Sequence, residues 1–135
     1  MPQRSQADVE KCPVFIASRI LGRKWAIVIL QELLTPEARD GLRFSEIQRR
    51  VEWITPKVLT TRLRQFEDEG IVHREVDASS IPPKVSYSLT EKGQGLRETV
   101  LSMQAWGQEF GKNAVVECTG RGFADCHECG TRKDD

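Results

Sequence analysis

The hydrophobic period of the sequence changes at Gly70, which narrows the possible folds. Before it, a helix is well marked, because Thr55 is a good N-cap, Pro56 a favoured first residue and Gly70 a good helix end. After it, "IVHREV" at 71–76 and "KVSYSL" at 84–89 alternate apolar and polar residues with a period of two. The proline-bearing stretch "DASSIPP" separates them, so the sequence predicts a helix followed by a β-hairpin.

Further helices are predicted on both sides of this unit. The segment at 24–34, "KWAIVILQELL", is apolar nearly all round, as expected for a helix at the centre of a small bundle. The other predicted helices are 12–21, 44–51 and a long final one at about 91–112, capped by Thr90. The expected fold class is mainly α with a small β-hairpin wing, in the order of a winged helix-turn-helix with a long terminal helix.

The composition fits one domain and points to no catalytic centre. Lys plus Arg equal Asp plus Glu at 20 each in 135 residues, so only local charge patterning bears on a nucleic-acid partner. We find no phosphate loop, nucleophile elbow or paired acids, so an enzyme is not expected. The start lacks a secretory apolar stretch, and the longest apolar run, "AIVIL", is too short to span a bilayer. We therefore expect a cytoplasmic protein without membrane contact.

The helix at 55–69 has two different faces. On a helical wheel at about 100° per residue, Leu59, Leu63 and Phe66 share one arc and would pack on the core. The three acids at 67–69 crowd the last turn, where they oppose the helix dipole and would repel phosphate. The arc opposite the apolar one carries two cations and two hydroxyls, with no acid until Asp68: Lys57, Thr60, Thr61 and Arg64.

This polarity predicts a helix that presents its N-terminal half to DNA, as helix-turn-helix recognition helices do. Arginine and lysine can donate to guanine or phosphate, and threonine can contact a thymine methyl or a phosphate. The wing would add phosphate contacts through Lys84, with Arg74 as a further candidate. The candidate DNA-binding residues are Arg49, Arg50, Thr55, Lys57, Thr60, Thr61, Arg64 and Lys84. Two alternatives stay open: a basic face that is merely solvated, and a winged-helix module that binds an acidic partner protein.

Several stretches resemble the HxlR-type winged-helix regulators, relatives of the MarR group. They follow the expected order over about 12–110: "CPV", "LGRKWAIVIL", "RFSEIQRRV", "TPKVLTTRLRQFEDEGIVHR", "PPKVSYSLTEKG" and "AWG". The resemblance implies a homodimer on a palindromic or pseudo-palindromic operator in double-stranded DNA, with the first and last helices in the dimer interface. Arg23, where the family more often has a second glycine, and the longer loop "TPEARDG" depart from the pattern, but neither touches the recognition helix.

Large apolar residues outside the recognition helix have two expected roles. Met103, Trp106 and Phe110 form a stripe at helical spacing on the final helix. Such stripes are usually intramolecular core, but little of the chain is left to cover so long a helix, so we expect dimer contact. Trp25 and Trp53, in contrast, are expected to fill the core, because aromatic residues usually serve packing first.

Cys12 begins the predicted helix at 12–21, where the helix dipole lowers the pKa of a thiol. The adjacent Lys11 acts in the same direction. The resemblance adds that some relatives use an N-terminal cysteine to sense oxidants or electrophiles. The alternative is a small buried residue at the dimer interface, because free cysteine is often fully buried. A thiol or metal sensor in which DNA binding is secondary also stays open.

The other three cysteines lie in the tail at 113–135, which we separate from a domain at 1–112. The two-residue spacing of Cys126 and Cys129 lets two thiolates reach one metal, so zinc is the candidate cofactor, with Cys118 as a third ligand. The fourth ligand would have to be His127, His73, Cys12 or a group from a second subunit. Such spacing also serves thiol–disulfide exchange, and a glycine-rich charged tail also fits disorder without a role. The sequence leaves these three readings open.

Overall fold

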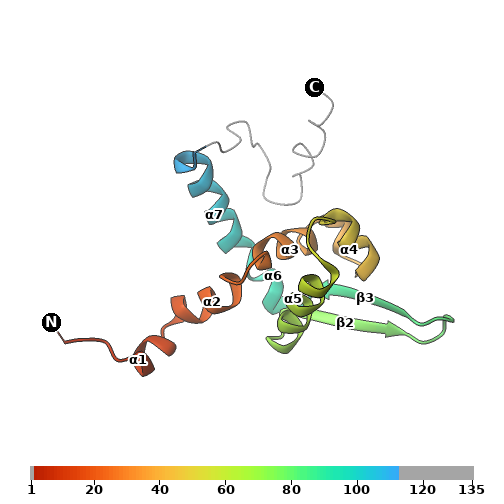
Figure 1. Cartoon of the computed structure of the whole chain (residues 1–135), viewed down its shortest axis with the longest axis horizontal. Helices are drawn as coiled ribbons and strands as arrows, with labels where there is room; N and C mark the ends of the chain where they lie inside the picture. The colour runs from red at the N-terminus through yellow and green to blue at the C-terminus, as the bar shows by residue number, and fades with distance from the viewer. Residues whose placement is uncertain (1, 113–135) are drawn as a thin grey trace.

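The computed structural model describes residues 2–112, which form a mainly helical fold with a small sheet (Figure 1). The tail at 113–135, and with it the candidate ligands Cys118, Cys126 and Cys129, lies outside the described residues. None of the helices in the described range has the length and apolarity that a membrane crossing requires. In chain order the elements are α1 (Gln6–Glu10), α2 (Pro13–Leu21), α3 (Ala26–Leu33), the 3-10 turn η1 (Pro36–Ala38), β1 (Leu42–Arg43), α4 (Phe44–Arg50), α5 (Pro56–Asp68), β2 (Val72–Asp77), β3 (Lys84–Leu89), α6 (Glu91–Gln94) and α7 (Arg97–Phe110).

Helix α3 lies at the centre of the fold, as its nearly all-apolar sequence predicts. Ala26, Ile29 and Leu30 on this helix have no exposed surface. They belong to one buried cluster that also takes side chains from α4, α5 and the sheet. The members from the two helices of the helix-turn-helix are Ile47, Leu59, Leu63 and Phe66. The predicted apolar arc of α5 is therefore confirmed.

The sheet has three antiparallel strands in the order β1-β3-β2. Strands β2 and β3 form the predicted hairpin, with Asp77 opposite Lys84 at its outer end. This hairpin extends from the body as a wing (Figure 1). Strand β1, which the sequence did not predict, pairs with the other edge of β3 and places Leu42 opposite Tyr87. A strand of two residues is too short to show an alternating period, which explains why pattern reading missed it.

The prediction of one long helix at about 91–112 is wrong, because the structure divides it into α6 and α7. Thr90 caps α6 as predicted, and its hydroxyl accepts the backbone N–H of Gly93 at 3.1 Å. Gly93 packs closely against the backbone of Ile71, the residue before β2. A Cβ at position 93 would lie 2.3 Å from the carbonyl oxygen of Ile71. Gly95 follows within the same turn. Two glycines so close together disfavour a continuous helix, so the chain is interrupted between α6 and α7.

The prediction that Trp25 and Trp53 fill the core is also wrong. Trp25 is 37% exposed and Trp53 is 57% exposed, and their rings contact each other edge to face with centroids 4.6 Å apart. Trp25 directly precedes α3 and has a left-handed backbone (φ 66°), whereas Trp53 lies in the turn between α4 and α5. Both positions are surface connections, where burial does not follow from aromatic character.

Two arms project from the body in different directions (Figure 1). One consists of α1 and α2, and the other is α7. The sequence did not predict α1, although its start is marked by a capping box. In this box Ser5 Oγ accepts the N–H of Asp8 at 3.1 Å, and the Asp8 carboxylate accepts the N–H of Ser5 at 3.3 Å. The arms leave the helix-turn-helix and the wing exposed on the other part of the molecule.

Candidate nucleic-acid interface

Helix α5 places the predicted polar face on the molecular surface. Lys57, Thr61 and Arg64 are exposed on the side opposite the buried arc, and Thr60 is half-buried at the edge of this face. The Thr61 hydroxyl donates to the carbonyl oxygen of Lys57 at 2.9 Å. In this rotamer its proton is used, so Thr61 can accept a hydrogen bond but cannot donate one to a phosphate. The two cations and Thr60 therefore remain the donors of this face.

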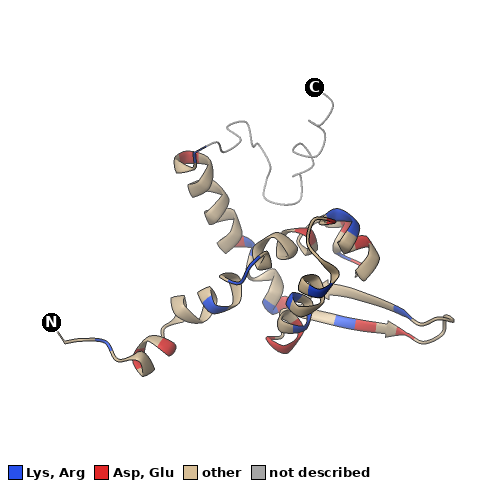
Figure 2. Cartoon of the chain, in the orientation of Figure 1, with Lys and Arg blue, Asp and Glu red and all other residues tan. Residues whose placement is uncertain are grey.

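The two ends of α5 carry opposite electrostatic character. At its start, Thr55 Oγ1 accepts the N–H of Val58 at 3.3 Å, and the first turn contains no acid. At its end, Glu67 and Asp68 are exposed, and Glu69 follows as the C-cap. Figure 2 shows this polarity as blue on the N-terminal part of α5 and red at its C-terminal end. The N-terminal half is thus the part of the helix that suits a polyanion.

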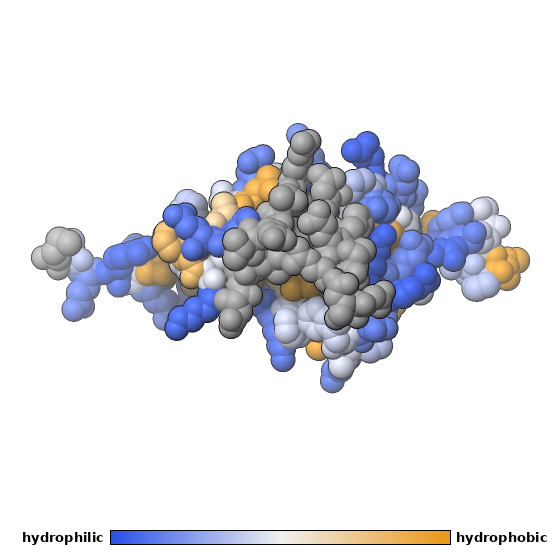
Figure 3. Space-filling model, turned by 90° about the horizontal axis from the view of Figure 1, so that it is seen from above, coloured by the Kyte–Doolittle hydropathy of each residue, from blue (hydrophilic) through white to orange (hydrophobic). Residues whose placement is uncertain are grey.

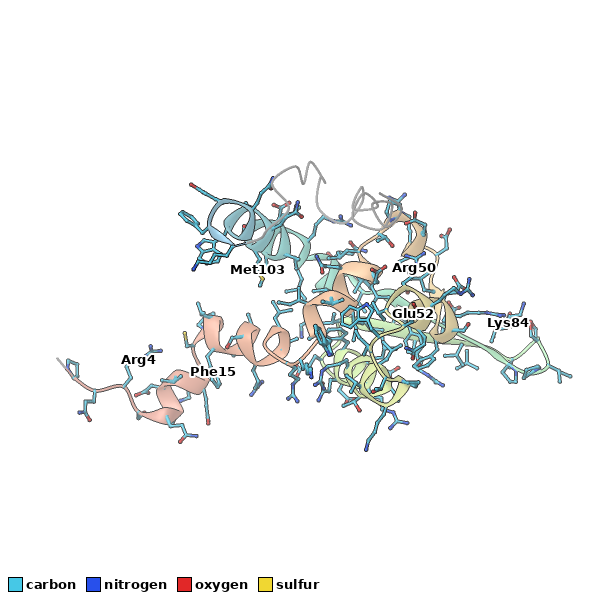
Figure 4. All side chains as sticks on the ribbon, turned by 45° about the horizontal axis from the view of Figure 1, so that its top comes forward. Arg4, Phe15, Arg50, Glu52, Lys84 and Met103 are labelled. Atoms are coloured by element: carbon cyan, nitrogen blue, oxygen red, sulfur yellow. The ribbon has the colours of Figure 1, made fainter. Side chains whose placement is uncertain are left out.

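The neighbouring arginines Arg49 and Arg50 at the end of α4 differ in their surroundings. Arg49 is exposed. Arg50 Nη1 lies 3.5 Å from Glu32 Oε2 and donates to Thr35 Oγ1 at 3.2 Å, so it ties α4 to the end of α3 (Figure 4). A phosphate contact by Arg50 would compete with this ion pair. Of the two, Arg49 is the one whose charge faces solvent and forms no ion pair with another described side chain.

Sequence reasoning missed Arg62, which has a positioning role on α5. Its Nε donates to the carbonyl oxygen of Lys24 at 2.8 Å, and its Nη1 donates to Gln65 Oε1 at 3.0 Å. These bonds hold the connection between α2 and α3 against the side of α5. The sequence offered no signal for this contact, because Lys24 and Arg62 lie 38 residues apart.

The wing presents cations beside acids. Lys84 is exposed at the start of β3 (Figure 4), opposite Asp77 of β2. Hydrogen bonds from Ser79 to the Asp77 carboxylate, with a smaller contribution from the charge of Lys84, lower the pKa of Asp77. Asp77 therefore keeps its negative charge at neutral pH. Arg74 is exposed next to Glu75 in the same strand. The cation at the outer end of the wing thus lies beside an acid, whereas the first turn of α5 contains no acid.

A family model described as HxlR-like helix-turn-helix matches residues 20–115 of this chain. That stretch includes the helix-turn-helix, the wing and both C-terminal helices. The chain belongs to the HxlR-like helix-turn-helix family. The resemblance stated from the sequence is therefore confirmed, and with it the class of winged helix-turn-helix transcriptional regulators.

Relatives of this HxlR-like chain share both sequence and architecture. The uncharacterised HTH-type transcriptional regulator YdeP of Bacillus subtilis is 41% identical over 107 residues, which cover 78% of this chain and 79% of YdeP. The solved structure of the reduced form of the transcriptional regulator YodB from B. subtilis matches with a TM-score of 0.64 and 36% identity, over 77% of this chain and 98% of that chain. The redox regulator HypR in its oxidised form matches with a TM-score of 0.60 and 42% identity, over 77% and 100%.

Cys12 of the HxlR-like chain is the N-cap residue of α2 and is half-buried. The backbone N–H groups of Phe15 and then Val14, at the start of α2, lower the pKa of the thiol, against a smaller opposing effect of burial. Arg4 adds a further small lowering, so the contributing cation is not the adjacent Lys11 that the sequence suggested. Figure 4 shows Arg4 and Phe15 on this N-terminal arm. Within the described residues no group of three metal-ligating side chains forms.

The predicted apolar stripe of α7 is exposed in a single protomer. Met103, Trp106 and Phe110 are 46%, 64% and 61% exposed, and the rings of Trp106 and Phe110 lie 5.6 Å apart. Met103 points from α7 into the space toward α2 (Figure 4). On α2, Val14 and Ile16 are also exposed. Figure 3 shows apolar surface on the side where α2 and α7 lie, and also at the outer end of the hairpin.

An apolar groove runs along the root of the same two arms. It has a volume of about 290 Å³ and is lined by α2, by the residue before β2, by α6 and by the residue before α7. Its lining residues are Pro13, Ile16, Ala17, Ile20, Leu21, Ile71, Lys92 and Leu96. The chain therefore exposes apolar residues at two places, the groove and the stripe of α7.

Proposed function

We propose that this HxlR-family chain binds double-stranded DNA sequence-specifically as a homodimer, with two copies of α5 in successive major grooves of a palindromic or pseudo-palindromic operator. The observation that carries the proposal is the exposed face of Lys57, Thr61 and Arg64, which contains no acid before the last turn of α5. Cations at the start of a recognition helix can donate to guanine or to phosphate. Acids at its end would keep that end away from the backbone.

The remaining candidate DNA-binding residues lie around this face, and we expect them to contribute to DNA binding in different ways. Thr55 and Thr60 lie at the start and the edge of the face, and Arg49 and Lys84 supply charge from α4 and from the wing. Arg50 contributes mainly by holding α4 in place through Glu32. An acidic partner protein would also be attracted to these cations. Duplex DNA is the better match because hydroxyls alternate with the cations on a single helix face, which suits base edges and phosphates together.

Homodimer formation is supported by the two arms. Their apolar residues are exposed in one protomer, and contiguous exposed aromatic surface of this kind marks protein–protein contact sites. A second copy supplies both complementary parts, because the Trp106 and Phe110 stripe of one protomer can occupy the apolar groove of the other. An isologous contact of this kind closes after two copies and gives a two-fold axis that matches a palindromic site.

The test of the proposal is DNA binding and its dependence on salt. A duplex selected from a random pool is expected to bind more tightly than an unselected one, and both affinities are expected to fall steeply with salt. If a dimer neutralises about six phosphates, a plot of log affinity against log salt has a slope of about −5. Fluorescence anisotropy at several salt concentrations measures this slope. A reduced, dimeric protein that ignores every duplex even at very low ionic strength contradicts the proposal.

We also infer that Cys12 makes this regulator responsive to oxidants or electrophiles. Support comes from its lowered thiol pKa and incomplete burial, and from relatives whose names and structures concern reduced and oxidised forms. A lowered pKa raises the fraction of the nucleophilic thiolate at neutral pH. The cysteines of the tail, as zinc ligands or as a disulfide pair, remain a sequence-based expectation.

The pH dependence of alkylation is expected to reveal this thiolate. Because the folded-state pKa of Cys12 is lowered, its alkylation by iodoacetamide should reach half-maximal rate at a lower pH in native protein than in urea-unfolded protein. Mass spectrometry of the peptide that contains Cys12 separates it from the other three cysteines. Arg4→Ala should move the midpoint upward only slightly, because the N–H groups of Phe15 and Val14 are the larger cause. Equal midpoints in native and unfolded protein would leave Cys12 with a structural role alone.

A further inference from the structure

Two exposed tryptophans form a contiguous aromatic surface that the proposed interface has not used. Trp25 and Trp53 contact each other edge to face, and the Nζ of Lys24 lies 5.5 Å from the centroid of the Trp25 ring. We call Lys24, Trp25 and Trp53 the tryptophan platform. The ring–ring contact hides only part of each indole, since Trp53 remains 57% exposed. Such paired exposure of large apolar side chains is uncommon on a surface without a partner.

The platform is attached to α5 at two points. Trp53 lies two residues before Thr55, the residue that caps α5. From the other direction, the hydrogen bond from Arg62 Nε to the carbonyl oxygen of Lys24 holds the platform against the side of the helix. The platform therefore lies beside α5, close to the residue that caps the helix and on the flank that carries Arg62.

The platform combines apolar indole rings with groups that can donate hydrogen bonds, which are the two indole N–H groups and the Lys24 ammonium. Neither indole N–H donates to a residue in the described part of the chain, and Lys24 forms no ion pair there. Lys24 is exposed, whereas the preceding Arg23, also exposed, lines a pocket together with Asp68 and Glu69 at the acidic end of α5. The acid nearest in sequence is Glu52, which is exposed beside Trp53. The platform thus offers unpaired donors and cations to an acceptor-rich partner.

We propose that the tryptophan platform packs on the sugar–phosphate backbone beside the major groove that α5 enters, and so supplies sequence-independent affinity. This inference rests on the proposed DNA binding. The indole N–H groups and the Lys24 ammonium donate to phosphate oxygens, while the ring surfaces cover deoxyribose. Contacts to the backbone fix the position of a protein on the duplex but carry no sequence information. Losing them weakens binding to operator and to random duplex by the same factor.

The first experiment uses the fluorescence of the platform itself. The chain has three tryptophans, and the third, Trp106, lies on α7. In full-length protein, the contribution of Trp53 to the emission is the difference between wild type and Trp53→Phe. Acrylamide quenching of this emission is expected to fall when saturating operator duplex is added, because the duplex covers the rings. The same addition to Arg64→Ala protein, at a duplex concentration too low for this variant to bind, is the matched control.

The second experiment measures affinity. Trp53→Ala is expected to raise the Kd for operator and for random duplex alike by about fivefold, the size of one lost aromatic contact. Lys24→Ala should reduce the slope of log affinity against log salt by about one, as expected for one lost phosphate contact. Trp53→Phe keeps a ring against Trp25 but lacks the N–H, so its Kd should lie between wild type and Trp53→Ala. Circular dichroism checks that each variant is folded.

The outcomes separate this inference from the proposed function. If wild type binds duplex and Arg64→Ala weakens it, while quenching is unchanged by DNA and Lys24→Ala keeps the wild-type slope, the platform does not touch DNA and only this inference fails. If Trp53→Ala does not fold, quenching and the Lys24 variant still decide. If wild-type protein binds no duplex under any condition, the proposed function and the platform fail together.

Discussion

Replacing Arg64 with alanine is expected to weaken operator binding by about tenfold or more, the loss typical of one specific base or phosphate contact. Arg64 is exposed on the acid-free face of α5, one helical turn beyond Thr60, and its planar guanidinium can donate two hydrogen bonds to one guanine. Asp68, exposed in the last turn, offers no donor. Asp68→Ala is therefore expected to leave the affinity unchanged or slightly higher. Gel-shift or anisotropy titration of both variants on the selected operator measures the difference.

The comparison between duplexes shows what Arg64 contacts. A loss confined to the selected operator indicates a base edge, whereas an equal loss on all duplexes indicates a phosphate. Asp68→Ala serves as the matched control, because it changes one exposed charge on the same helix. Equal effects of the two substitutions would remove the assignment of this face to DNA.

Introducing glutamate at both Trp106 and Phe110 is expected to convert the dimer into monomers at micromolar concentration. Both residues are more than half exposed in the protomer, so the substitutions remove little from its core and the fold should persist. In the proposed dimer, however, two carboxylates per chain would enter an apolar contact without a partner. Truncation of central aromatic residues alone often costs 2 kcal/mol or more, roughly a thirtyfold change in Kd, and buried charge adds to this. Analytical ultracentrifugation reports the mass directly.

The matched control for this variant is Ala105→Glu. Ala105 is exposed on the same helix, and at 100° per residue it points away from the Met103, Trp106 and Phe110 stripe. It should remain dimeric. The double variant should also lose affinity for a two-half-site operator far more than for a single half-site, because linked half-sites act at high effective concentration. An unchanged mass for the double variant would exclude α7 from the interface.

The sequence predicted the recognition helix and the wing because local chemistry marks them. Thr55, Pro56 and Gly70 act at the helix ends without help from the rest of the chain, and the period of two in the sequence marks β2 and β3, although Val72 is the one buried residue of β2. The elements that pattern reading missed depend on distant contacts. Strand β1 exists because β3 offers it an edge, and the break before α7 depends on the approach of Gly93 to Ile71.

In the candidate site, too, some features follow from the local sequence and others depend on distant contacts. The polar face of α5 follows from helix periodicity alone, so Lys57, Thr61 and Arg64 were correctly predicted to be exposed. The sequence could not distinguish Arg49 from Arg50, because the difference depends on Glu32 in another helix. The exposure of the tryptophan platform was likewise unpredictable, since burial of an aromatic ring depends on which connections pass over it.

The close approach of Gly93 to the sheet has a geometric consequence for operator choice. With no room for a Cβ beside the Ile71 carbonyl, α6 is seated against the body, and α7 departs from that fixed base. In the proposed dimer the direction of this departure sets the distance between the two α5 helices. That distance must correspond to one turn of B-DNA, about 34 Å, for both helices to enter major grooves on the same side. In the proposed dimer, the joint that Gly93 and Gly95 form between α6 and α7 would therefore set the spacing between the two half-sites.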